Sequence, residues 1–207
     1  MGKPEIGTTV VVDVPATTAN LGPGFDCLGA ALDLNNQFQL KVLEGGAERF
    51  ELIIESKEGS HLRGGPDNLV YRAAQRVWRE VGMQPIALEA RVQLAVPPAR
   101  GMGSSATAIV AGLMGANALA GEALGKEKLL ELAIDIEGHP DNVVPSLLGG
   151  LCLTAQAASR RWRVVRCEWH ENVQAVVAIP SIRLSTADAR RAMPKQIVVP
   201  DAVSNLG

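Results

Sequence analysis

The sequence contains few aromatic residues and few cysteines. Phe, Trp and Tyr make up only 3% of its 207 residues, so a core must be built from Ala, Val, Leu and Ile. The three cysteines, Cys27, Cys152 and Cys167, are odd in number and form no CxxC pair. A disulfide framework or a zinc site is therefore not expected, and a reducing, cytoplasmic environment fits the chain best.

The sequence also lacks an excess of charge and any long apolar run. Its formal net charge is -2, which gives no general attraction to nucleic acid or to an anionic membrane. Its first residues have neither the apolar segment of a signal peptide nor the Ser or Thr of a myristoylation motif. With 47% hydrophobic and 20% charged residues, the chain is predicted to fold around a sizeable core, with neither nucleic acid nor a membrane as partner.

The predicted elements run from strands to helices and back to strands. Alternating or β-branched stretches predict strands, and helical spacing of apolar residues predicts helices. The expected strands are 8–14, 37–42, 50–56, 87–96, 151–154, 162–165 and 173–179; the expected helices are 68–81, one from the 97–107 turn to about 120, 126–136 and 186–191, with a short helical segment after 142. Residues 15–26 and 137–142 are expected to be loops. This order favours an α+β fold over a regular βαβ array.

A glycine- and serine-rich turn at residues 101–105, Gly-Met-Gly-Ser-Ser, lies between a predicted strand and a predicted helix. Glycines let backbone N–H groups approach a phosphate, and a helix start adds the positive end of a dipole. The turn alone leaves three interpretations open: a phosphate-binding loop, the loop of an NAD-binding Rossmann domain, and a tight turn that binds nothing. The Rossmann interpretation lacks its context, because Glu122, the acidic residue about twenty positions on, lies between two helices.

Three longer motifs carry a family resemblance. Residues 97–106, Pro-Pro-Ala-Arg-Gly-Met-Gly-Ser-Ser-Ala, resemble the phosphate-binding motif of the GHMP kinases. Residues 15–26, Pro-Ala-Thr-Thr-Ala-Asn-Leu-Gly-Pro-Gly-Phe-Asp, and residues 137–145, Glu-Gly-His-Pro-Asp-Asn-Val-Val-Pro, resemble the homoserine kinases within that family. Residues 184–190 give a weaker match, so the resemblance covers nearly the whole chain.

The resemblance implies a two-domain α+β fold. Residues 1–160 would form an ATP-binding N-terminal domain similar to domain 2 of ribosomal protein S5, and residues 161–207 would begin a ferredoxin-like C-terminal domain. Because family members continue well past Gly207, we expect a chain truncated at its C-terminus, with an incomplete second domain. Family members often pair, so the resemblance allows a homodimer.

The implied activity is ATP-dependent phosphorylation of the side-chain hydroxyl of L-homoserine, which gives O-phospho-L-homoserine and ADP in threonine biosynthesis. One alternative is another GHMP small-molecule kinase, such as a mevalonate or shikimate-type kinase. The other is a nucleotide-binding fragment without catalytic activity.

The resemblance also assigns residues to ATP and Mg²⁺. Eleven residues would wrap the ATP phosphates, mostly through backbone N–H groups: Pro97, Pro98, Ala99, Arg100, Gly101, Met102, Gly103, Ser104, Ser105, Ala106 and Thr107. Ser105 and Glu131 would hold Mg²⁺, a hard ion that prefers oxygen ligands. Glu131 could equally be a solvated helix residue, and Asn68, which matches a position near the adenine, could equally be a helix N-cap.

Four side chains are assigned to the amino-acid substrate. Asp26 would pair with its ammonium group, with Asn20 beside it, and Arg190 would bind its carboxylate. His139 would lie near the reacting hydroxyl. Asp26 could instead form an Asx turn, and His139 could only stabilise a loop.

The expected chemistry does without a carboxylate base. Asn142 stands where several GHMP relatives have a carboxylate, and an amide cannot accept the substrate proton. Asp141 is adjacent but would have to face the site to act as the base. We therefore expect direct attack by the hydroxyl, assisted by Mg²⁺, a helix N-terminus and the hydroxyl of Thr186.

Overall fold

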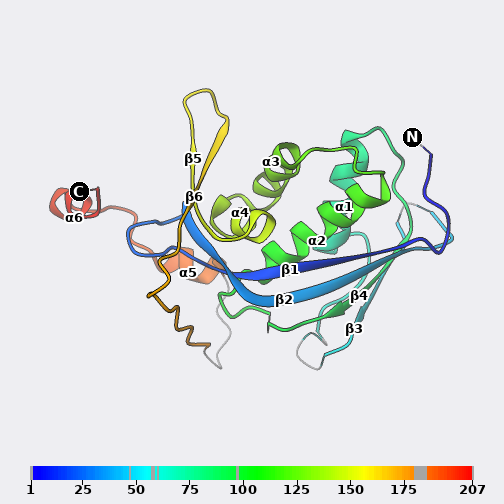
Figure 1. Ribbon diagram of the computed structural model, residues 1–207, viewed down its shortest axis with the longest axis horizontal. Helices are drawn as coiled ribbons and strands as arrows, with labels where there is room; N and C mark the ends of the chain where they lie inside the picture. The colour runs from blue at the N-terminus through cyan, green and yellow to red at the C-terminus, as the bar shows by residue number, and fades with distance from the viewer. Residues whose placement is uncertain are drawn as a thin grey trace.

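The computed structural model describes residues 2–46, 48–56, 59, 61–96, 98–179 and 186–206. The strands are β1 (Thr9–Ala19), β2 (Leu28–Val42), β3 (Phe50–Ile54), β4 (Leu88–Gln93), β5 (Leu151–Gln156) and β6 (Trp162–Cys167). The helices are α1 (Leu69–Glu80), α2 (Ser104–Leu119), α3 (Lys126–Glu137), α4 (Pro140–Leu148), α5 (Thr186–Ala192) and α6 (Val199–Leu206). Helices α1 to α4 cover one face of a single six-stranded sheet (Figure 1), so the expected α+β arrangement is confirmed.

The long strand β2 lies at the centre of the sheet. One edge pairs with β1 from Lys41 opposite Thr9 to Gly29 opposite Ala19. The other edge pairs with β4 near its C-terminal end and with β5 near its N-terminal end. Beyond Pro15 a register shift lets β1 continue to Ala19 despite the proline. The prediction of a loop over residues 15–26 is therefore wrong in its first part, and the connection spans residues 20–27.

The core lies between the sheet and the helices. Val12 and Val14 of β1 point into it, whereas Val11 is exposed, as strand alternation requires. Helix α2 is buried along most of its length and lies close to α1, because Gly112 has no side chain: a Cβ there would lie 2.2 Å from the carbonyl oxygen of Val70. This close contact fixes the direction of α2 and hence the position of its N-terminus.

Beyond β6 the chain leaves this core. All residues from Glu168 to Ile179 are exposed. The predicted strand at 173–179 is not formed, because no described strand lies beside it to pair with. Helix α5 forms as predicted, whereas α6, which was not predicted, lies apart from the sheet (Figure 1). No helix within the described ranges is long and apolar enough to cross a bilayer.

The predicted domain boundary at residues 160 and 161 falls in the turn between β5 and β6. These two strands pair from Leu151 opposite Cys167 to Gln156 opposite Trp162, so β6 belongs to the same sheet as β1 to β5. The division into two domains stays a prediction.

Candidate active site

The three sequence motifs and the weaker match meet at one cavity of about 800 Å³. Asn20 and Phe25 reach it from the β1–β2 connection, and Ser104 from the start of α2. His139 lies at the start of α4, and Arg190 enters from α5. Residues separated by most of the sequence therefore surround one space that is large enough for a nucleotide and a small molecule.

The glycine-rich loop forms one wall of this cavity. Residues 98–105 and Thr107 line it, Ala106 is buried behind it, and Pro97 lies outside the described residues. The loop reaches α2 through three left-handed residues, Ala99, Gly101 and Gly103, with φ of 60°, 73° and 67°. The first backbone N–H groups of α2 have no partner within the helix, so this end can bind an anion.

A buried asparagine that sequence reasoning missed holds both ends of this loop. Asn36 of β2 is fully buried, and its Oδ1 accepts hydrogen bonds from the N–H groups of Ala95 (2.9 Å) and Val96 (3.2 Å). Its Nδ2 donates to Thr107 Oγ1 at 3.1 Å. One side chain therefore ties the strand to the loop and to the first turn of α2. In the sequence Asn36 lies between Asn35 and Gln37, and its alternation with Phe38 and Leu40 was the only signal for it.

The carboxylate that faces Ser105 belongs to Glu137 and not to Glu131. Ser105 Oγ donates to Glu137 Oε1 at 2.6 Å, and the Glu137 side chain is only 11% exposed. Glu131 is exposed and does not line the cavity. Six residues of helix turn a side chain by about 240° and move it by about 9 Å, so the two glutamates point in different directions. The expected pairing of Ser105 with Glu131 is corrected accordingly.

His139 is held between two carboxylates just before α4. Its Nδ1 lies 2.5 Å from Asp141 Oδ1, and its Nε2 lies 4.0 Å from Glu137 Oε1. The hydrogen bond with Asp141 raises the pKa of His139, although partial burial acts in the opposite direction. Asp141 is 1% exposed and does not line the cavity. Its carboxylate therefore orients the imidazole and does not face a substrate.

Asn142 lies beside the glycine loop and is fixed by a threonine of β1. Thr17 Oγ1 donates to Asn142 Oδ1 at 2.7 Å, and a Cβ on Gly103 would lie 1.9 Å from the same hydroxyl oxygen. Because the amide oxygen already accepts this hydrogen bond, the Nδ2 group remains to donate into the cavity that Asn142 lines. Thr17 lies inside the N-terminal motif, which was the available signal for its role.

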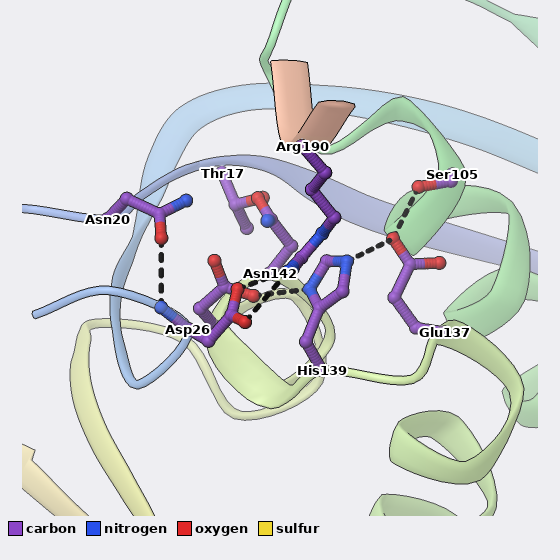
Figure 2. A network of polar contacts seen from close by, with 9 residues as sticks. Thr17, Asn20, Asp26, Ser105, Glu137, His139, Asn142 and Arg190 are labelled. Atoms are coloured by element: carbon purple, nitrogen blue, oxygen red, sulfur yellow. Dashed lines mark hydrogen bonds and ion pairs between the residues drawn. The ribbon is translucent and has the colours of Figure 1, made fainter. Parts of the chain in front are cut away.

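Asp26 and Arg190 form an ion pair, and His139 lies between this pair and Ser105 in Figure 2. Arg190 donates two hydrogen bonds to the Asp26 carboxylate, at 2.6 and 3.1 Å, and this pairing raises the pKa of Arg190. Asn20 Oδ1 accepts the backbone N–H of Asp26 at 2.9 Å and so closes the loop. Ligand atoms of Asp26, His139 and Asp141 lie within 4.8 Å of one another. The four residues assigned to the amino acid, Asn20, Asp26, His139 and Arg190, thus lie around Asp26.

Two further predicted residues have separate outcomes. Asn68 caps α1, accepting the N–H of Val70 at 2.9 Å, and donates to the carbonyl oxygen of Arg63 at 2.8 Å. It also lines the cavity, beside Leu69, so the N-cap is observed and the role near the adenine stays a prediction. Thr186 begins α5, but its side chain lies outside the described part of the chain.

Comparisons with known proteins agree with this arrangement. Residues 68–150 match the family model described as the GHMP kinases N terminal domain. Over all 207 residues the chain is 81% identical to a homoserine kinase of Synechococcus sp. (strain CC9605) and 77% identical to one of Prochlorococcus marinus (strain NATL2A). The crystal structure of a homoserine kinase from Cytophaga hutchinsonii matches with a TM-score of 0.78 and 27% identity, over 100% of this chain and 67% of that one. The chain spans 66% of the length of the two sequence relatives.

Proposed function

Because the chain belongs to the GHMP kinase family, we propose that it carries most of the active site of a homoserine kinase. Such an enzyme transfers the γ-phosphoryl group of ATP to the side-chain hydroxyl of L-homoserine. The observation that carries the proposal is that an anion-binding helix start and Arg190, which forms an ion pair with Asp26, line the same cavity. A nucleotide and an amino acid could therefore bind next to each other.

The ATP phosphates would bind at the start of α2. The N–H groups of its first turn and the Ser104 hydroxyl supply donors, and the helix dipole favours negative charge. Arg100 adds a cation whose Nη1 is buried without a hydrogen-bond partner in the described structure. Apolar residues such as Leu52 and Ile54 line another part of the cavity, with Asn68. This part would suit the adenine ring.

The residues beside the phosphate loop fit a magnesium ion. Ser105 and Glu137 offer a hydroxyl and a carboxylate oxygen, which are the donors that Mg²⁺ prefers. When bound, the ion would neutralise charge on the transferred phosphoryl group. Glu137 therefore takes the role that the sequence resemblance assigned to Glu131.

The substrate amino acid would bind between Asp26 and Arg190. Its ammonium group would pair with Asp26 and its carboxylate with Arg190, which can donate two parallel hydrogen bonds. Its hydroxyl would then point toward His139 and Asn142, which line the cavity between this ion pair and Ser105. Binding both reactants in one orientation is the main task in phosphoryl transfer.

The reaction would proceed without a carboxylate base. The hydroxyl oxygen bonds to the γ-phosphorus while the bond from that phosphorus to ADP breaks, and the hydroxyl proton passes to an oxygen of the phosphoryl group. Asn142 Nδ2 would orient the hydroxyl by donating a hydrogen bond. Asp141 does not serve as the base in this scheme because it is buried outside the cavity lining and its Oδ1 is paired with His139.

A substrate panel tests the proposal. The full chain is incubated with Mg²⁺, ATP and, separately, L-homoserine, mevalonate, shikimate and galactose, and the products are identified by mass spectrometry. We expect O-phospho-L-homoserine and an equal amount of ADP. Phosphorylation of another acceptor alone would favour a different GHMP kinase, and ATP binding without any product would favour a nucleotide-binding fragment.

A matched pair of variants tests the substrate site. Arg190→Gln should raise the KM for L-homoserine, because it removes the group that binds the carboxylate. Arg191→Gln changes a neighbouring arginine on the same helix that pairs with Asp188 and does not line the cavity. It should leave the KM unchanged. Equal effects of the two variants would contradict the assigned role of Arg190.

We also propose a cytoplasmic location and a homodimer. The cysteines are free, which fits a reducing cytoplasm. A homodimer is proposed from the family resemblance alone.

A further inference from the structure

In the structure, the two groups proposed to bind the amino acid bind each other. Arg190 donates both hydrogen bonds to Asp26, at 2.6 and 3.1 Å. An α-amino acid that takes the place of these hydrogen bonds separates the ion pair. The ammonium group then replaces Arg190 at Asp26, and the carboxylate replaces Asp26 at Arg190. One ion pair is exchanged for two, so the charges stay balanced.

This exchange removes the hydrogen bonds that fix Arg190. The residue belongs to α5, where every side chain from Asp188 to Ala192 is exposed, and its own side chain is 40% exposed. Asp141 attracts it over a longer distance, but the carboxylate of Asp141 is bound to His139. Arginine has several rotatable bonds, so a guanidinium released from Asp26 would lose its orientation unless another contact held it.

Phe25 supplies such a contact. The Arg190 guanidinium carbon lies 5.4 Å from the centre of the Phe25 ring, within the range of a cation–π interaction. The ring is 47% exposed and lines the cavity, in a chain with only three phenylalanines. An interaction through the ring face leaves the N–H groups of the guanidinium free to bind a carboxylate.

The backbone that carries Phe25 is held independently of the ion pair. The preceding residue, Gly24, donates its N–H to the carbonyl oxygen of Leu21 at 3.1 Å and accepts the N–H of Leu28 at 3.0 Å. A Cβ at Gly24 would lie 2.3 Å from the Leu28 Cβ, so the turn is tightly packed. The backbone position of Phe25 is therefore set by the β1–β2 connection, whatever the state of the ion pair.

We propose that Phe25 is a positioning residue for Arg190: its ring keeps the guanidinium at the cavity while Asp26 exchanges Arg190 for the ammonium group of the substrate. This inference rests on the proposed homoserine kinase function. It adds a specificity determinant for α-amino acids, since only a ligand with both charges restores two ion pairs.

Kinetics of the full chain give the first test. Phe25→Leu should raise the KM for L-homoserine about 2- to 5-fold, as expected for a cation–π contact at a partly exposed site, while kcat and the KM for ATP stay unchanged. Phe25→Tyr should keep the wild-type KM, because it keeps the ring. Trp169→Leu is the matched control, since Trp169 is 45% exposed and does not line this cavity.

A double-mutant cycle separates positioning from a general effect on folding. In an Arg190→Gln background, Phe25→Leu should add nothing further to the KM, because the group that the ring holds is gone. Additive effects of the two substitutions would overturn the proposal.

A second measurement does not depend on activity. The ring current of Phe25 should shift the Arg190 side-chain Nε–H resonance in the ligand-free chain. This shift should persist in Asp26→Asn and disappear in Asp26→Asn combined with Phe25→Leu. Loss of the shift in the single variant Asp26→Asn would refute the role of Phe25. A wild-type chain that shows the shift but does not phosphorylate L-homoserine would refute only the proposed function.

Discussion

Replacing Glu137 with glutamine should selectively weaken Mg²⁺ binding. The glutamine carbonyl oxygen can still accept the hydrogen bond from Ser105, now 2.6 Å long, so the local packing is kept and only the negative charge is lost. Glu137 is 11% exposed, so water offsets little of that loss. Removal of an outer partner of a metal ligand costs 10- to 100-fold in affinity. A carboxylate that binds the metal itself should therefore cost about 100-fold or more, or about 2.7 kcal/mol.

Glu131→Gln is the matched control for this substitution. It removes the same charge from the same helix, but the side chain is exposed and does not line the cavity. Its axial separation from Glu137 is about 9 Å, close to the screening length of about 8 Å at physiological salt. We therefore expect less than a twofold change in Mg²⁺ requirement for this control.

The assay measures the free Mg²⁺ concentration that gives half-maximal phosphoryl transfer at saturating ATP. A readout independent of turnover is the number and affinity of Mn²⁺ ions bound with ATP, counted by electron paramagnetic resonance. If Glu131→Gln changed both quantities and Glu137→Gln changed neither, the assignment made from the Ser105 hydrogen bond would be wrong.

Three further predictions concern packing, thiol reactivity and the chemistry of the site. Gly29→Ala should destabilise the chain by about 1–3 kcal/mol, because its Cβ would lie 1.8 Å from the backbone oxygen of Asp141. The control Gly46→Ala, whose Cβ would have no atom within 4 Å, should change stability by less than about 0.5 kcal/mol. Urea denaturation measures both free energies, and equal values would contradict the close contact at Gly29. Burial raises the pKa of Cys152, so iodoacetamide should label it only in the unfolded chain. The partly exposed Cys27 and Cys167 should react in the native state. Peptide mass spectrometry identifies the labelled cysteines, and labelling of Cys152 in the native chain would disprove its protection. Asn142→Asp should lower turnover roughly tenfold, because a negative charge would face the phosphates; a higher kcat would argue against the base-free scheme.

Local features could be predicted from the sequence because they depend on near neighbours. The glycine loop and the start of α2 follow from residue types within a few positions, and so does the cap that Asn68 forms on α1. The α+β class follows from the order of strand-like and helix-like stretches. The motifs at 15–26, 97–106 and 137–145 identified the family because they are long and specific.

Errors arose where the outcome depended on distant contacts or on helix phase. The extension of β1 to Ala19 depends on pairing with β2, and the absence of a strand at 173–179 depends on the lack of a described neighbour. The choice between Glu131 and Glu137 depends on which face of α3 meets the start of α2. Residue type alone does not reveal that face, because both positions are glutamates next to apolar residues.

The sequence by itself determined the family, the fold class and a set of chemically suitable residues, since each of these is carried by local composition or by a contiguous motif. Only the tertiary structure decided which of those residues meet. Thr17 and Asn142 are 125 positions apart, and Asp26 and Arg190 are 164 apart. Their contacts exist because sheet pairing and the packing of α2 and α4 bring the ends of several elements to one cavity, and a spacing in the sequence does not record that geometry.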